Sequence, residues 1–353
     1  MATIQDIASQ LNISKSTVSK ALNGAPDVSE TLRKSVLETA VELGYSRTAR
    51  SKQAKRLCLF IENMNPSEPT DFGHDIVIGF RKLAEPAGFV VETVLLNKQI
   101  QKDNRYDEYM LKHNYAGAFF LGMSLSDIWL RDLQTSHTPA VLLDNYVKGN
   151  PNICYVGVDN NEGMELAVTH LQSLGHKRIG YLSGGLGSFV NQSRYSAFFR
   201  ALKHNGCPDS RSLAGSDYLF SECLQKHLPR LLKQNVTGII CSHDLLAHTV
   251  MMHCLELGLD IPRDLSIIGF DDLPLCAYTI PPLTTIRQDR TQLGKSGFYA
   301  LSSLLSDVPI STLLLHAQLT LRQSTAAPSA LPGTALPRSH PPKKEREGAN
   351  TRG

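Results

Sequence analysis

The chain has 353 residues, more than one hydrophobic core usually takes, so we expect two or three domains. Hydrophobic residues make up 42% of the sequence and charged residues 20%, a balance typical of a globular protein and not of a disordered or fibrous one. No apolar run approaches the ~20 residues that cross a bilayer, so we expect no membrane span. The amino terminus lacks the pattern of a secretory signal, which predicts a cytoplasmic protein.

Charge is distributed unevenly along the chain. Residues 1–56 hold nine Lys or Arg against five Asp or Glu, whereas residues 57–324 carry a net charge of −4. A basic head on an acidic body is expected when the head binds a polyanion. The seven cysteines are scattered and form no C-x-x-C pair, which predicts reduced core residues and argues against disulfides and a zinc site. One reactive thiol remains the alternative.

The first 45 residues have the pattern of three short helices. Thr3 and Asp6 form a capping pair at the start of the first helix, which we expect to end near residue 10. Ser14 caps a second helix that ends near residue 22, and Ser29 caps a third that ends at Gly44.

The second predicted helix has a polar side and an apolar side. Its polar side, which is free to enter a major groove, consists of Lys15, Ser16, Ser19 and Lys20. Lysine donates to guanine O6 and N7, and serine bonds to several base edges, but both also bind phosphate. A solvated face of an ordinary helical bundle has the same pattern, so this pattern alone leaves DNA binding open.

From residue 57 onward, apolar strand runs alternate with helical segments, which predicts parallel α/β sheets. The first series of strands is expected at 57–61, 89–95, 117–121 and 140–143, and the second at 155–158, 178–182, 236–241 and 265–269. A last strand-helix-strand unit, ending near residue 322, is available to return to the first half. We therefore expect two subdomains, approximately 57–155 plus 285–322, and 156–284. Residues 46–56 read as a basic linker and 326–353 as a disordered tail.

Several ordered motifs lie along the chain. They are TIQDIA at 3–8, ISKSTVSKALNG at 13–24, VSE at 28–30, LGY at 43–45, GHKRIGY at 175–181, IGFDD at 268–272 and PLTTIRQD at 282–289. In order and spacing they resemble the lactose/galactose repressor (LacI/GalR) family over residues 3–322. The resemblance implies an all-α helix-turn-helix headpiece at 1–45, a hinge at 46–56, and a type I periplasmic-binding-protein-like α/β core at 57–325.

The resemblance also implies a function. Members are homodimers whose paired headpieces read near-palindromic double-stranded operator DNA, because two-fold protein symmetry matches two-fold DNA. A small effector, most often a sugar or sugar derivative, binds between the two core subdomains and controls operator affinity. We therefore expect a transcriptional regulator, most commonly a repressor, that needs no cofactor. Whether the effector releases or recruits DNA stays open.

Matching positions assign expected DNA contacts within the headpiece. Lys15, Ser16 and Lys20 should face base edges, whereas Thr17, Ser19 and Asn23 should anchor phosphates. The family usually has arginine where Lys20 stands, and an ammonium lacks the planar fork that reads guanine bidentately.

The linker departs from the family pattern. It has neither the usual proline nor the leucine that wedges into the central minor groove and kinks it. Arg47, Arg50 and Lys52 either occupy a narrow minor groove electrostatically or contact phosphates from a flexible linker, and the sequence leaves both readings open.

Matching positions also assign the expected effector contacts. Arg194 should grip effector oxygens and Asp271 should be its opposing carboxylate, with a structural salt bridge as the alternative. The other expected pocket residues are Phe72, Asp144, Phe220, His243 and Gln288. Aromatic or histidine side chains at strand ends are often only core residues, which is the alternative for several of them.

Two other classes of protein share this architecture. A solute-binding protein of a transporter would need a signal peptide and no basic headpiece, the opposite of this sequence. An α/β enzyme would need a nucleophile, metal or cofactor site. The glycine-rich segment 183–188 lacks the Lys-Ser/Thr ending of a phosphate loop, and no nucleophile elbow or metal-spaced His/Cys set occurs. We therefore expect no catalytic residue and no metal ligand.

Overall fold

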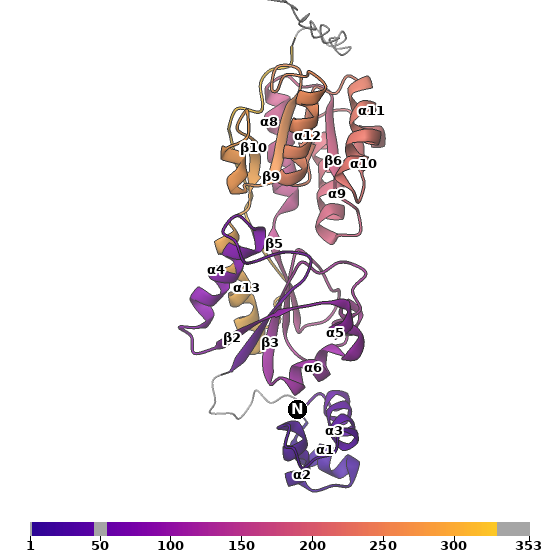
Figure 1. The fold of residues 1–353 in the computed structure, drawn as a ribbon, viewed down its shortest axis with the longest axis vertical. Helices are drawn as coiled ribbons and strands as arrows, with labels where there is room; N and C mark the ends of the chain where they lie inside the picture. Colours follow the sequence, from indigo (N-terminus) through magenta and orange to yellow (C-terminus); the bar gives the residue numbers. More distant parts are fainter. Residues whose placement is uncertain (1, 46–54, 330–353) are drawn as a thin grey trace, which may run out of the picture.

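A computed structural model describes residues 2–45 and 55–329, and three parts follow one another along its long axis (Figure 1). The headpiece lies at one end, a first α/β subdomain in the middle and a second α/β subdomain at the other end. The expected hinge contacts Arg47, Arg50 and Lys52 lie outside the described residues, as do residues 330–353 of the expected tail.

The headpiece consists of α1 (Ile4–Leu11), α2 (Lys15–Leu22) and α3 (Glu30–Glu42). The predicted caps are confirmed: Thr3 and Asp6 form a reciprocal capping box, and the side chains of Ser14 and Ser29 accept hydrogen bonds from backbone amides of the helices that they begin. Gly44 has φ +66°, the left-handed conformation that ends a helix. Buried residues at helical spacing on all three helices form one small core.

The first subdomain contains a six-stranded parallel sheet in the order β11-β5-β4-β3-β1-β2. The strands are β1 (Arg56–Ile61), β2 (Val90–Leu95), β3 (Tyr115–Leu121), β4 (Ala140–Leu143), β5 (Ile153–Val158) and β11 (Thr312–Leu315). Every residue of β3, β4 and β5 is buried, as the continuous apolar runs predict for strands covered on both faces. The helices are α4 (Phe72–Ala84), α5 (Lys98–Asp103), α6 (Tyr106–Lys112), α7 (Trp129–Asp132) and α13 (Arg290–Leu305).

The second subdomain contains another six-stranded sheet, in the order β12-β10-β9-β8-β6-β7. Its strands are β6 (Ile179–Ser183), β7 (Ala214–Ser216), β8 (Gly238–Cys241), β9 (Ser266–Asp271), β10 (Thr284–Arg287) and the antiparallel edge strand β12 (Gln318–Thr320). The helices around it are α8 (Asn160–Ser173), α9 (Phe189–His204), α10 (Phe220–Glu222), α11 (Leu228–Lys233) and α12 (Asp244–Glu256). Two similar α/β halves are therefore present, as the alternation of patterns indicates.

The boundary between the halves differs from the predicted one. The run at 155–158, expected to open the second series, is part of β5 in the first sheet, whereas β10 pairs with β9 in the second. The last expected strand, 312–322, is two strands, β11 in the first sheet and β12 in the second. The chain thus crosses between the sheets three times. An apolar run identifies a buried strand but does not show which of two similar sheets it joins.

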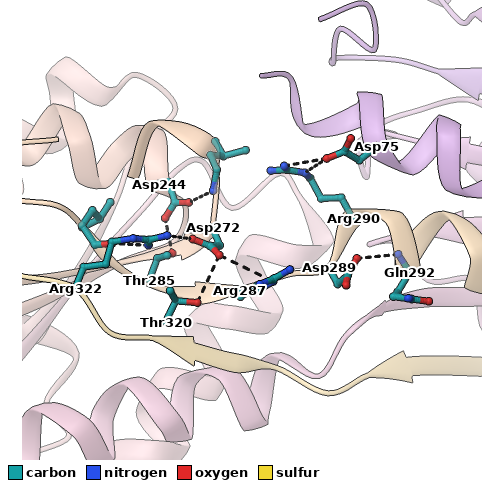
Figure 2. A network of polar contacts seen from close by, with 12 residues as sticks. Asp75, Asp244, Asp272, Thr285, Arg287, Asp289, Arg290, Gln292, Thr320 and Arg322 are labelled. Carbon is teal, nitrogen blue, oxygen red and sulfur yellow. Dashed lines mark hydrogen bonds and ion pairs between the residues drawn. The ribbon is translucent and has the colours of Figure 1, made fainter. Parts of the chain in front are cut away.

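Polar contacts fix the chain on both sides of the second crossing, from β10 to α13 (Figure 2). On one side, Arg287 at the end of β10 lies 4.0 Å from the Asp272 carboxylate, to which Arg322 also donates at 2.6 Å. On the other, Arg290 donates to Asp75 of α4 at 3.0 Å. Between them, Asp289 caps α13 by accepting from the amide of Gln292. The ends of the crossing are therefore anchored to separate subdomains.

The carboxyl-terminal end of the described chain stays attached to the second subdomain. The amide of Ala326 donates to Ser266 Oγ at 3.1 Å, and Ser329 Oγ donates to the carbonyl of Arg263 at 2.5 Å. The first four residues of the predicted disordered tail, 326–329, therefore remain attached to the second subdomain.

The headpiece also contacts the body directly. Leu111 of α6 is buried in the same apolar cluster as Val36 and Val41 of α3, and the backbone of Gly44 lies against the His137 ring. Helix α2 lies toward the outer end of the headpiece, away from the subdomains (Figure 1). The contact therefore leaves α2 uncovered.

We predict that helices α4 and α13 will not accept a methyl group where they cross. A Cβ atom at Gly294 would lie 2.0 Å from the carbonyl oxygen of Ile76, so Gly294→Ala must push the helices apart. We expect a loss of about 1–3 kcal/mol in unfolding free energy, measured by urea denaturation followed by circular dichroism. Gly187→Ala is the matched control, because no atom lies within 4 Å of the added Cβ. Equal stability of the two variants would contradict the close helix contact.

Candidate DNA-binding surface and effector pocket

Helix α2 presents its expected contact residues on one side. Val18, Ala21 and Leu22 are buried in the headpiece core, and this burial turns the opposite side outward. On that side, Lys15, Ser16, Lys20 and Asn23 are exposed and Thr17 and Ser19 are half-buried. The six residues expected to contact DNA thus lie together on the helix and its carboxyl-terminal cap, and the most exposed of them are those assigned to base edges plus Asn23.

Lys20 has a partner that the sequence reasoning missed. Its amine donates to Asp27 Oδ2 at 2.5 Å, and both side chains are more than half exposed. The hydrogen bond from Lys20 holds the pKa of the Asp27 carboxyl below its usual range. Water and salt weaken such an exposed pair, so Lys20 can exchange Asp27 for a base edge or a phosphate. The available signal was an acid seven residues onward, across the turn at Gly24.

A cavity of about 340 Å³ lies between the two subdomains. It is lined by Asn63, Met64, Phe72, Gly122, Met123, Ser124, Leu143, Asp144, Ser188, Val190, Asn191, Arg194, His243, Asp271 and Gln288. Six of the seven expected effector residues are among them. Phe220 is not, and its ring instead packs on the His243 ring, with centroids 5.1 Å apart.

Strand ends place most of the polar groups in this cavity. Asp144 follows β4, His243 follows β8, Asp271 ends β9 and Gln288 follows β10, so each stands at the carboxyl edge of a sheet, where α/β proteins bind ligands. Two of these residues have left-handed backbones, Asp144 with φ +52° and Asp271 with φ +120°. Such conformations of a residue other than glycine cost of order 1–3 kcal/mol each and are concentrated at functional sites.

Arg194 is held firmly by its own subdomain. Its Nε donates to Asn160 Oδ1 at 2.9 Å, its Nη1 donates to the carbonyl of Ser242 at 2.5 Å, and its guanidinium carbon lies 3.7 Å from the centre of the Phe270 ring. The side chain is almost completely buried. Its Nη2 makes no hydrogen bond to any residue in the described ranges, which leaves one limb of the fork for a ligand.

Asp271 lies between Arg194 and Gln288. Its Oδ1 accepts from Gln288 Nε2 at 2.6 Å and lies 3.5 Å from Arg194 Nη1. Burial raises the pKa of the Asp271 carboxyl, an effect that Arg194 opposes. The salt bridge that was the alternative for this pair is therefore present, and both residues still line the cavity.

Asp144 is the least compensated group in the cavity. Neither of its carboxylate oxygens accepts a hydrogen bond from a described residue, and Oδ1 is fully buried. Burial raises the pKa of Asp144 to about 6, and the nearby Asp271 adds to this whereas Arg194 opposes it. The carboxyl is therefore mostly ionised at neutral pH without a bonded partner.

His243 is a neutral donor at the cavity wall. Its Nδ1 accepts from the amide of Leu246, so a neutral ring carries its proton on Nε2. Burial lowers the pKa of His243 and keeps the ring uncharged. Next to it, Asp244 is a buried acid that the sequence reasoning missed, which accepts from Thr285 Oγ1 at 2.6 Å and from the amide of Leu273 at 2.8 Å. Asp244 thus joins α12 to β10.

Contacts between the subdomains close one side of the cleft. The amide of Leu125 in the first subdomain donates to the carbonyl of Gly187 in the second at 3.2 Å. The ring of Phe189 at the start of α9 stacks with Tyr146 at 6.2 Å between centroids and meets Tyr155 edge-on at 5.5 Å. Sequence reasoning missed these residues, which lie in the loops after β3 and β4, within β5 and at the start of α9.

Within residues 2–45 and 55–329, no group of three or more His, Cys, Asp or Glu side chains is arranged to hold a metal ion. In the same ranges no helix is long and apolar enough to cross a membrane.

Comparisons with known proteins identify both parts of the chain. Residues 3–48 match the family described as bacterial regulatory proteins, lacI family, and residues 168–325 match a periplasmic binding protein-like domain. The chain is 29% identical over 338 residues to the HTH-type transcriptional regulator MalR of Streptomyces coelicolor, which covers 92% of this chain and 96% of MalR.

Solved structures have the same fold. A complex of the transcriptional regulator CelR with cellobiose has a TM-score of 0.66 and 22% identity, covering 92% of this chain and 100% of that one. The lac repressor dimer bound to operator and the anti-inducer ONPF has a TM-score of 0.63 and 24% identity, covering 92% and 99%.

The two matched domains follow each other in the order that the structure shows, and MalR matches across both. Relatives matched over nearly the whole chain are named as transcriptional regulators or repressors. The protein is thus a DNA-binding transcriptional regulator and not an enzyme, and its headpiece matches the lacI family of bacterial regulatory proteins.

Proposed function

We propose that this protein is a cytoplasmic, homodimeric repressor whose affinity for a near-palindromic operator is set by a small polyhydroxyl effector in the cavity between the subdomains. The observation that carries the proposal is the free polar side of α2, on a headpiece whose own core is complete. Two such helices, related by a two-fold axis, fit successive major grooves on one side of a duplex.

The roles of the α2 residues follow from their exposure. Lys15, Ser16 and Lys20 are exposed along the helix and are proposed to contact base edges, whereas the half-buried Thr17 and Ser19 and the exposed Asn23 at the carboxyl-terminal cap are proposed to contact phosphates. The basic residues Arg47, Arg50 and Lys52 of the linker are proposed to add contacts between the half-sites. Each phosphate that Lys or Arg neutralises releases counterions, so binding should weaken steeply with salt.

The cavity is proposed to bind the effector and to couple it to the headpieces. A ligand that touches Asp144 of the first subdomain and Arg194 or Asp271 of the second favours the closed arrangement of the two. Closing moves the first subdomains of a dimer relative to each other and changes the spacing of the headpieces that follow them. The CelR complex with cellobiose supports a sugar-like ligand, as does the wealth of hydrogen-bond acceptors in the cavity.

Exposed apolar residues support the homodimer. In the second subdomain Tyr278 and Ile280 are 84% and 83% exposed, and α12 exposes Leu245, Met252 and Leu255. Soluble monomers rarely expose such groups of large apolar side chains. A second copy of the chain is the proposed partner, since a dimer is what a two-fold operator requires.

We predict that a charge at position 280 separates the dimer. Ile280→Asp should shift the sedimentation velocity profile from dimer to monomer and weaken operator binding at least tenfold at fixed protein concentration, because one headpiece alone loses half of the contacts. Val308→Asp, which changes an apolar residue of similar size and 51% exposure in another loop, is the control. A dimer that survives Ile280→Asp would place the interface elsewhere.

We predict operator binding with a steep negative dependence on salt, measured by fluorescence anisotropy with a labelled duplex selected from a random pool. Absence of duplex binding at low salt would reject the proposed function. Adding the effector should change the affinity, and the sign of the change distinguishes release from recruitment.

Two lysines test the division between base and phosphate contacts. Lys20→Ala should lower discrimination between the selected duplex and a scrambled one, by about 1–3 kcal/mol if the lysine reads a guanine. Lys52→Ala should weaken both duplexes alike and reduce the salt slope by about one. Identical behaviour of the two variants would refute the assignment.

A further inference from the structure

The cavity has an unusual balance of charge and hydrogen-bonding groups. Among the fifteen described residues that line it, Arg194 is the single Lys or Arg, against the carboxyl groups of Asp144 and Asp271. Arg194 lies beside Asp271, so its charge offsets that carboxylate. The Asp144 carboxylate therefore has no ion-pair partner among the described residues.

Several acceptors around the cavity lack a hydrogen bond. Both oxygens of Asp144, the Oδ2 atom of Asp271 and the buried Oε1 atom of Gln288 accept no hydrogen bond from the described chain. Among the charged and ring side chains that line the cavity, the free donors are Arg194 Nη2 and the Nε2 proton of His243. A ligand that satisfies the two carboxyl groups must bring hydrogen-bond donors.

A second pair of carboxyl groups, Glu62 and Asp127, lies next to residues that line the cavity. Glu62, which ends the first strand region, is buried and hydrogen-bonded to Asp127, and Gln101 donates to it at 3.0 Å. Burial and Asp127 raise the pKa of Glu62 to about 7, so the Glu62 carboxyl is partly protonated near neutral pH. Gly122 and Ser124, beside this pair, line the cavity.

We propose that the cavity selects a polyhydroxyl ligand that carries a protonated amine, bound at Asp144, and that it rejects phosphorylated and carboxylated ligands. An ammonium donates three hydrogen bonds and cancels the charge that the protein leaves open, whereas a phosphate would meet two carboxylates and a single free guanidinium limb. The proposal rests on the proposed function only in taking this cavity as the effector site.

The test uses isothermal titration calorimetry on the full chain with matched sugars. For glucose, galactose and mannose, the parent sugar is compared with its 2-amino-2-deoxy derivative and its 6-phosphate. We expect at least one amine to bind about tenfold or more tightly than its parent, because a hydrogen bond to a charged group contributes about 1.5–3 kcal/mol. The phosphates should show no binding. A phosphate that binds as tightly as its parent, or amines that bind no better than their parents or not at all, would overturn the proposal.

Asp144→Asn separates charge from shape. The amine should lose its advantage over the parent sugar, to within about twofold, while the parent sugar keeps its affinity.

The preference for the amine should also depend on pH in the wild-type protein. Arg194, Asp271 and Tyr155 are the groups that act electrostatically on Asp144. With a pKa of about 6, Asp144 ionises as pH rises through that value, so amine affinity should rise and then level off above it.

A second measurement needs no ligand. The pKa of Asp144 is raised by folding to about 6 from an ordinary value of 3.8, so the folded state binds the proton more tightly and loses stability as pH rises between these values. Asp144→Asn removes that loss and should raise the melting temperature by about 3–5 °C at pH 8 and by little at pH 4. Asp209→Asn, an exposed carboxyl, is the control. No increase at pH 8 would show that the Asp144 charge is already compensated, and would overturn the proposal.

Operator binding, measured on the same preparations, separates this inference from the function on which it rests. If duplex binding is present and the amine preference is absent, the ligand inference alone fails. If duplex binding is absent, the proposed function fails, whatever the calorimetry shows.

Discussion

The site depends on one constraint: charged side chains of two subdomains, joined by three chain crossings, are buried where the subdomains face each other. The cavity lies where the carboxyl ends of strands from both sheets meet, so polar groups of both halves converge there. Arg194 is fixed by Asn160, by the carbonyl of Ser242 and by the Phe270 ring, all in its own half. Asp144 comes from the other half and has no comparable support. A ligand that joins the two halves therefore completes interactions that the chain leaves incomplete.

That incompleteness has an energetic meaning. A buried carboxyl without donors destabilises the free protein, and left-handed backbones at Asp144 and Asp271 add strain. A ligand that donates to the carboxyl reduces the first of these costs, so the unpaired carboxyl increases the difference in free energy between the occupied and unoccupied states. A regulator needs such a difference, since a ligand shifts a conformational equilibrium only by its differential affinity for the two states. The same groups in a purely structural interface would be paired.

Local chemistry made the headpiece predictable from sequence. Thr3, Ser14 and Ser29 cap helices through side chains a few residues from the amides that they bind, so the sequence alone contains both partners. Most strands were also predictable, because they are apolar runs in the sequence. Their distribution between the sheets could not be predicted, because the sequences of β5 and β10 do not show which strands they pair with, and only long-range pairing assigns them. The Lys20–Asp27 pair and the Asp244 network were missed for the same reason: their partners are brought together by turns and by packing.

Six of the seven pocket residues expected from the family resemblance line the cavity, and the local structure explains why Phe220 does not. Phe72, Asp144, His243, Asp271 and Gln288 line the cavity because each lies at a strand end or helix start that the fold fixes, and Arg194 reaches it from the second turn of α9. Phe220 belongs to a three-residue helix whose position depends on the adjacent loop, and it packs behind His243 instead.

The contact between headpiece and body gives the effector signal a route besides the linker. Leu111 of α6 is buried among α3 side chains, so the headpiece rests on the first subdomain and not on the second. The helix that bears Leu111 directly precedes β3, whose carboxyl end leads into Gly122 and the lip of the cavity. A movement of the first subdomain on closure therefore reaches α3 through one continuous segment of packed chain. Since α2 lies on the outer side of the headpiece, such a movement reorients the DNA-contacting side without covering it.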